Sequence, residues 1–138
     1  MSDAVSGIGA EFRRQNGSVF EKIAEVISIS GPSMTRETID VTNLDSTGGY
    51  REFIASLRDG GTIELELNFL RSTYETMLSD FQSDTVQTYE IVLPDAENTT
   101  ITFSGLVTDM PLDIAMDAQI KYTVTIKITG QITVASGT

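Results

Sequence analysis

Two runs of strictly alternating apolar and polar residues constrain the fold of this chain more than any other feature. In the first run, Thr62–Phe69, apolar residues occupy every second position, and the polar residues between them include Glu64, Glu66 and Asn68. The second run, Gln119–Val134, sets Ile, Tyr and Val against Lys and Thr in the same way. Because successive side chains of a strand point to opposite faces, each run predicts a β-strand with one face in a core.

Shorter segments complete the predicted strands. Each is rich in β-branched or aromatic residues and is bounded by turn formers. They are Val19–Ile29, Thr35–Thr42, 52–58, Val86–Leu93 and Thr99–Val107. The conformation of 50–58 is ambiguous, because its apolar residues have helical spacing while the Asp59-Gly60 pair that follows is a strong hairpin signal. A hairpin needs a strand on each side of its turn, so we predict that 52–58 pairs with Thr62–Phe69.

One helix is predicted, over Ser72–Phe81. Ser72 and Glu75 have the spacing of a capping box. The apolar face of this helix comprises Tyr74, Met77, Leu78 and Phe81. With strands before and after the helix, the order of elements predicts a mainly β fold, a two-sheet sandwich or barrel-like sheet pair with one flanking α-helix.

The length of 138 residues fits one domain. We assign 1–18 to a flexible N-terminal arm, 19–135 to the β domain and 136–138 to a C-terminal tail, because the first segment is rich in Gly, Ser and charge and has no sustained period. The first residues lack the basic and apolar regions of a signal peptide, and no apolar run is long enough to span a bilayer. We therefore expect synthesis in a cytoplasm.

The composition argues against an enzyme. The chain has no Cys and no His, which removes thiolate chemistry and the side chain most used for proton transfer near neutral pH. Asp109, Asp113 and Asp117 are four residues apart, but Pro111 argues against a helix that would bring them together, and we interpret them as a solvated acidic loop. We predict no catalytic residue, no cofactor and no metal site.

The charge and the long strands point to assembly instead of chemistry. With 9 Lys and Arg against 20 Asp and Glu, the formal charge of −11 repels nucleic acid phosphates and anionic membranes. Long exposed strands aggregate unless their edges are covered, and a closed ring of identical subunits covers every edge.

Four segments carry a resemblance to a known family: Thr38–Thr42, Tyr50–Ile54, Leu57–Gly61 and Ile63–Leu67. Over about Glu21–Val134 the chain resembles the major tail tube proteins of long-tailed, non-contractile (siphovirus-like) bacteriophages. The resemblance implies a structural virion protein whose copies form six-fold rings that stack into a tail tube. It also implies tape-measure, tail terminator and baseplate proteins as partners, passage of DNA without specific binding, no membrane contact, and a location in the virion tail after synthesis in the host cytoplasm.

The resemblance implies three sets of assembly residues. The loop that typically contacts the next ring comprises Asn43, Leu44, Asp45, Ser46, Thr47, Gly48, Gly49 and Tyr50. The N-terminal arm, which typically orders on assembly, offers Val5, Ile8, Phe12, Arg13 and Arg14. Glu64, Glu66 and Asn68 are candidate lumen-facing residues, with the tube exterior or a subunit interface as the alternative location. An acidic lumen lets DNA slide, whereas a basic lumen binds it.

Two other functions remain open from the sequence. One is a monomeric β-sandwich binding module of a virion or cell surface, which the absence of Trp disfavours. The other is a tube subunit of a contractile tail or of a machine like type VI secretion, because the same fold recurs in those tubes.

Overall fold

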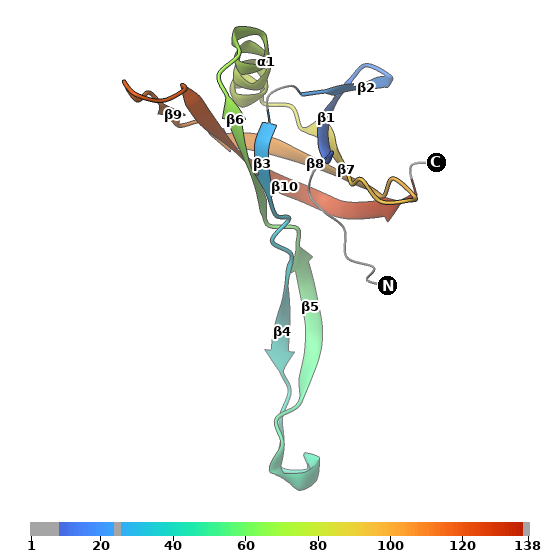
Figure 1. Ribbon diagram of the computed structural model, residues 1–138. Helices are drawn as coiled ribbons and strands as arrows, with labels where there is room; N and C mark the ends of the chain where they lie inside the picture. Colours follow the sequence, from blue (N-terminus) through green and yellow to red (C-terminus); the bar gives the residue numbers. More distant parts are fainter. Residues whose placement is uncertain (1–8, 24–25, 137–138) are drawn as a thin grey trace.

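The chain folds into two antiparallel β-sheets of unequal size and one α-helix (Figure 1). This computed structural model describes residues 9–23 and 26–136. The strands are β1 (Glu11–Asn16), β2 (Val19–Lys22), β3 (Val26–Ser30), β4 (Thr35–Asp40), β5 (Phe53–Asp59), β6 (Thr62–Asn68), β7 (Gln87–Val92), β8 (Thr100–Asp109), β9 (Leu112–Asp113) and β10 (Lys121–Ala135). The helical segments are the short 3-10 turn η1 (Thr47–Gly49) and the helix α1 (Arg71–Gln82). The prediction of a mainly β fold with two sheets and one helix is confirmed.

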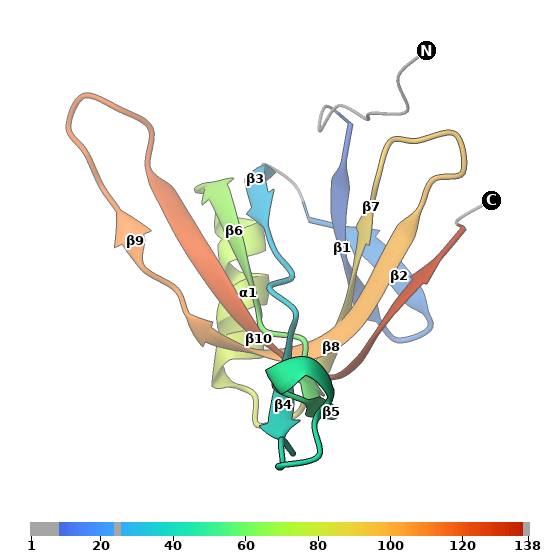
Figure 2. The same ribbon diagram turned by 90° about the horizontal axis from the view of Figure 1, so that it is seen from below.

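The larger sheet has eight strands and bends strongly, so that β3 and β6 come to lie opposite β1 and β7 (Figure 2). Its strands follow the order β2-β1-β7-β8-β10-β6-β3, with β9 paired to β10. The long strand β10 serves both halves, because its first part pairs with β6 and its last part pairs with β8. A register shift between Thr129 and Thr133, with Gly130 at a φ of 86°, is an irregularity of the kind that bends a strand.

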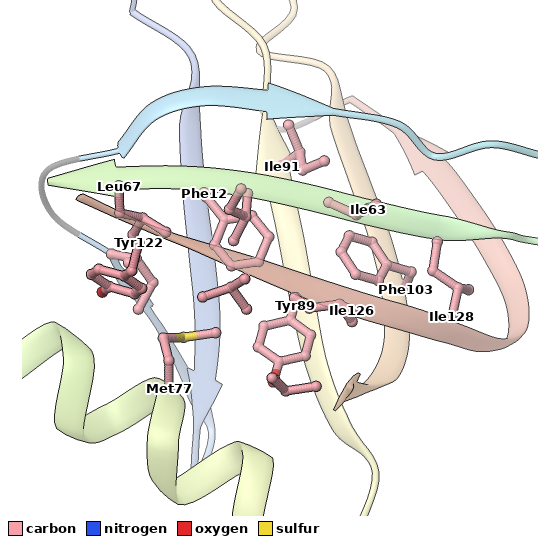
Figure 3. Close-up of a cluster of buried hydrophobic side chains, with 14 residues drawn as sticks. Phe12, Ile63, Leu67, Met77, Tyr89, Ile91, Phe103, Tyr122, Ile126 and Ile128 are labelled. Atoms are coloured by element: carbon pink, nitrogen blue, oxygen red, sulfur yellow. The ribbon is translucent and has the colours of Figure 1, made fainter. Parts of the chain in front are cut away.

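The core lies between the halves of the bent sheet and against α1 (Figure 3). The alternation in the two long runs is confirmed, because Ile63, Leu65 and Leu67 of β6 are fully buried. Tyr122, Val124, Ile126 and Ile128 of β10 are buried with them. Residues from β1, β7 and β8 close the core from the other side, and this burial of apolar area is the main stabilising contribution to the fold.

The predicted boundary of the N-terminal arm is wrong. Residues 11–16 form β1, which pairs with β7 inside the larger sheet. The Phe12 side chain is fully buried and stacks on Tyr89 with 5.5 Å between the ring centroids. The segment lacks a long apolar period, which favours an arm, but one large aromatic residue is enough to anchor a short strand in a core.

The segment Val19–Ile29 is not one strand, as predicted from its β-branched residues. It contains β2 and β3, which form the two opposite ends of the eight-stranded sheet. Between them Ile23 is buried in the core, and its backbone N–H donates to the Phe12 carbonyl oxygen at 2.8 Å.

The predicted hairpin at Asp59-Gly60 is also wrong, although the strand predicted over 52–58 is confirmed as β5. β5 pairs with β4 in a separate two-stranded sheet, while β6 pairs with β3 and β10 in the larger one. The Asp59 carboxylate accepts a hydrogen bond from the Gly61 N–H at 2.7 Å, which makes a tight local bend. The Asp-Gly signal therefore marks a change of direction between sheets.

The predicted helix is present, but it starts differently. α1 begins at Arg71, its N-cap is Leu70, and no side chain caps it. Glu75 instead accepts a hydrogen bond from Arg71 at 2.9 Å, one turn earlier. The buried residues of the helix are Thr73, Met77 and Asp80. The face that the helix buries therefore differs from the predicted apolar face, and Phe81 of that predicted face is about half exposed.

Candidate functional site

The ribbon formed by β4 and β5 is the most unusual surface of this chain. It projects away from the larger sheet and ends in η1 (Figure 1). Ile39 lies opposite Ile54, and Asp40 lies opposite Phe53, so that apolar side chains occupy both faces of the ribbon. All three apolar side chains are about half exposed. Because a two-stranded ribbon is only marginally stable in water by itself, this pattern indicates a surface that another molecule covers.

The predicted inter-ring residues Asn43–Tyr50 all lie at the tip of the ribbon. The tip is held by its own hydrogen bonds, among them one from the Asp45 N–H to the Asn43 side-chain oxygen at 2.7 Å. The Ser46 hydroxyl donates to Glu52 at 3.0 Å and links the two sides of the tip. Leu44 is fully exposed at this tip. An ordered tip that presents a bare leucine is suited to insert into an apolar recess of a partner.

The root of the ribbon is closely packed around Gly60 and Gly61. A Cβ atom added at Gly60 would lie 2.6 Å from Ile128 Cγ2. Gly61 has a φ of 75°, and its carbonyl accepts a hydrogen bond from the Ile128 N–H at 3.0 Å. Asp59 also accepts from Lys127 Nζ at 3.3 Å, and the Gly61 N–H together with Lys127 holds the pKa of the Asp59 carboxyl below its usual range. These contacts fix where the ribbon leaves the larger sheet.

The predicted lumen residues Glu64, Glu66 and Asn68 share the face of β6 that points away from the core. They alternate with the buried residues of that strand. Thr123 and Thr125 of β10 lie opposite Glu66 and Glu64 respectively. Glu66 also forms an ion pair with Lys121 at 3.8 Å, so part of the carboxylate charge on this face is neutralised locally.

The candidate arm residues have structural roles in the described part of the chain. Arg14 donates two hydrogen bonds to Asp80 of α1, at 2.7 and 2.6 Å, and hydrogen bonding to Asp80 raises the pKa of the Arg14 guanidinium. Tyr89 also donates to Asp80, at 2.8 Å, and burial raises the pKa of the Tyr89 hydroxyl. Arg13 pairs with Glu11 at 2.6 Å on the outer side of the sheet.

Two of the candidate arm residues, Val5 and Ile8, lie outside the described residues. The buried carboxylate of Asp80 was not predicted, and the only signal for it is its position three residues after Met77 on the helix.

The acidic side chains of the described residues do not form a metal-binding cluster. Within 9–23 and 26–136, no three acidic side chains come close enough together to hold a metal ion. Asp109 ends β8 and Asp113 ends β9, and both are exposed, like Asp117. No helix in the described part of the chain is long and apolar enough to cross a membrane.

The comparisons with known proteins agree with an assembling surface. The family model described as "Lambda phage tail tube protein, TTP" matches residues 7–135. No curated protein is similar enough in sequence to count as a relative.

Several solved structures share the fold. A chain from the tail of an empty gene transfer agent particle with C6 symmetry is 22% identical, with a TM-score of 0.82 over 96% of this chain and 100% of that one. A chain of the sheath–tube complex of an extracellular contractile injection system is 13% identical, with a TM-score of 0.73 over 97% of this chain and 93% of that one. A chain of the SPP1 tail tube is 7% identical, with a TM-score of 0.72 over 96% and 80%.

The family match covers nearly the whole chain, including both sheets and α1. It favours a tube subunit over a monomeric binding module, and it places the protein in the virion tail. The projecting ribbon, the polar outer face of β6 and this match together lead to one conclusion: the chain belongs to the lambda phage tail tube protein family and is a structural subunit of a phage tail tube.

Proposed function

We propose that six copies of this chain close into a ring and that the rings stack into the tail tube. The observation that carries this proposal is the β4–β5 ribbon, which stands out from the fold with apolar residues on both faces. A contact with the next ring through Asn43–Tyr50 covers these residues and stabilises the ribbon. The proposed six-fold symmetry is supported by the similar gene transfer agent tail chain, whose tube has C6 symmetry.

Within a ring, the proposed contact joins the edges of neighbouring sheets. β2 and β3 are the two end strands of the eight-stranded sheet. Val19 on β2 is 59% exposed and Ile27 on β3 is 46% exposed. Pairing of β2 of one copy with β3 of its neighbour covers both side chains and supplies partners for the backbone groups of both edges.

The proposed lumen wall is the outer face of β6 and β10. Glu64, Glu66 and Asn68 project from it beside a row of threonines on β10. Carboxylates and hydroxyls at this wall let the DNA pass without a strong contact, because DNA phosphates are repelled by carboxylates over the screening length of about 8 Å. In this proposal the tube is a passive conduit without enzymatic activity, is made in the host cytoplasm, and is built with a tape-measure protein and closed by terminator and baseplate proteins.

Electron microscopy of negatively stained, concentrated protein tests the proposal. The sample is the purified chain, alone and mixed with its tape-measure protein. We expect rings or tubes of uniform diameter in at least one of the two samples. A strictly monomeric species in both samples would overturn the proposal.

Variants of the ribbon tip separate stacking from ring formation. Leu44→Asp is expected to abolish tubes while leaving the melting transition of the subunit unchanged, since Leu44 has no contact with the core. Ser79→Asp on the exposed side of α1 introduces the same charge and serves as the matched control. Normal tubes from the Leu44→Asp variant would remove the tip from the stacking contact.

A further inference from the structure

Arg36 and Arg58 form an unusual pair at the root of the ribbon. They lie directly opposite each other in the pairing of β4 with β5, and both are exposed. Like charges in directly opposed positions of a sheet destabilise it. Among the described residues, neither guanidinium has a carboxylate within ion-pair distance, although the chain carries a formal charge of −11. Two of the nine cationic side chains are thus placed together without an acidic partner among residues 9–23 and 26–136.

The segment 109–117 has the complementary chemistry. It carries three exposed carboxylates, of Asp109, Asp113 and Asp117, and within the described part of the chain none of them forms an ion pair. Two of its apolar residues are strongly exposed as well, with Ile114 at 65% and Met116 fully exposed. Acidic and bare apolar side chains on one loop suit a partner that offers both cations and apolar area.

The two complementary surfaces project in different directions from one molecule. In Figure 1 the ribbon points downward from the larger sheet, while β9 and the loop that follows it extend toward the upper left. Complementary patches at different places on one subunit produce a head-to-tail contact between copies, and such a contact repeats as an open stack when the rotation between copies does not close a ring. This is the geometry that a stack of identical rings requires.

We propose that Arg36 and Arg58 bind the carboxylates of segment 109–117 of the copy that follows along the tube. Leu57 points to the face of the ribbon opposite Arg58, so segment 109–117 lies along the edge of β5, where the exposed Leu57 packs on Ile114 and Met116 of that copy. This inference rests on the proposed stacking of rings and names the two surfaces that meet there. It also explains why the arginines are tolerated opposite each other, because acidic side chains of the next copy neutralise them on assembly.

A second copy of this chain is the occupant that the surfaces favour. Double-stranded DNA also attracts arginine, but it has no apolar surface that would cover Leu57. Leu57 is 77% exposed, and segment 109–117 offers both carboxylates for the arginines and apolar side chains for Leu57. Binding of DNA to the arginine pair is therefore an outcome that the experiment has to exclude.

Charge reversal tests the contact, in the presence of the tape-measure protein if it is needed for tubes. The first variant is Arg36→Glu with Arg58→Glu, the second is Asp109→Lys with Asp113→Lys and Asp117→Lys, and the third combines all five substitutions. We expect each of the first two to raise the protein concentration needed for tubes by about tenfold or more, since like charges then face each other. The combined variant should restore tubes. Arg71→Glu on the exposed start of α1 is the control and should assemble normally.

Disulfide trapping provides a second measurement that does not depend on charge. The chain has no Cys, so any disulfide must come from introduced thiols. Leu57→Cys together with Ile114→Cys in one chain should give a ladder of covalent oligomers when tubes are oxidised, whereas each single variant should give dimers at most.

The outcomes are distinguishable from a failure of the proposed function. If the wild-type chain forms tubes and both charge-reversed variants do so equally well, the proposed contact is wrong while the tube proposal stands. The proposed contact is also wrong, and the tube proposal stands, if the charge-reversed arginine variant assembles normally and only loses affinity for a DNA duplex. A wild-type chain that stays monomeric with its tape-measure protein overturns both proposals.

Discussion

Removal of the Asp80 carboxylate is the perturbation for which the structure predicts the largest loss of stability from a polar residue. The Asp80 side chain is 1% exposed and accepts two hydrogen bonds from Arg14 and one from Tyr89. These bonds join α1 to β1 and to β7. In Asp80→Ala, a guanidinium and a buried hydroxyl lose their acceptor at once. Breaking a buried pair by removing one partner costs about 3–5 kcal/mol.

The expected loss lies at the lower end of that range. The Arg14 side chain is 18% exposed, so water reaches part of the orphaned guanidinium and reduces the penalty. We therefore expect Asp80→Ala to lower the free energy of unfolding by about 3 kcal/mol. Tyr89→Phe removes only one of the three hydrogen bonds and should cost about 1 kcal/mol.

Urea unfolding followed by far-ultraviolet circular dichroism measures these changes, at a protein concentration where the chain is monomeric. The double variant Arg14→Met with Asp80→Leu leaves no buried charge unpaired and should cost only about 1–2 kcal/mol, because the Tyr89 hydroxyl still loses its acceptor. This account of the Arg14–Asp80 contact would be refuted if Asp80→Ala cost less than about 1 kcal/mol. It would also be refuted if the loss of stability in the double variant equalled the sum of the losses in the two single variants.

Four further predictions concern stability. Phe12→Ala should lower the free energy of unfolding, measured by thermal melting, by about 3–5 kcal/mol, because β1 belongs to the folded domain. A change under about 1 kcal/mol would mean that this segment is a loose arm. Leu65→Ala should cost about 2–5 kcal/mol in the same assay, whereas an unaffected variant would contradict its burial. Gly60→Ala should cost about 1–3 kcal/mol, because its methyl group meets Ile128; a neutral effect would mean that the ribbon root can shift. The Asp95 carboxylate accepts hydrogen bonds from the Thr99 hydroxyl and N–H, which lower the pKa of Asp95, so the stabilising effect of this carboxylate is present at neutral pH and is lost as the pH falls through that lowered pKa. Asp95→Asn should therefore lose less stability on acidification than the wild type, and an equal loss in both proteins would exclude the contact.

The local patterns of the sequence were sufficient for the elements that face the core. The alternation in Thr62–Phe69 and Gln119–Val134 predicts β6 and β10 correctly. Each strand buries one face, and side chains of a strand alternate between faces, so burial of one face produces a sequence period of two. β1 was missed because its share of the core is a single residue, Phe12, with polar neighbours whose partners lie on α1 and β7. A contact such as Arg14 with Asp80, 66 residues apart, leaves no local periodicity from which it could be predicted.

The wrong hairpin has a different physical cause. Asp59-Gly60 does what its residues favour, which is to form a tight bend, and the bend alone does not determine which strand pairs with which. β5 has an available partner in β4, and β6 has two in β3 and β10. The contacts of Gly60 and Gly61 with Ile128 accompany the observed pairing, and they join residues far apart in the chain, so no local pattern contains them.

The candidate assembly residues follow from a mismatch between pattern and burial. Ile39 and Val41 alternate with polar residues as regularly as the apolar residues of β6, yet they are 49% and 40% exposed in the subunit, whereas Ile63 and Leu65 are fully buried. Since both segments satisfy the same strand pattern, the difference lies in what is present to cover them. A strand pattern whose apolar positions are exposed in the monomer is therefore best explained by burial in the assembled state. We therefore expect the ribbon to be buried in the assembled tube, and its stability to rise when rings stack.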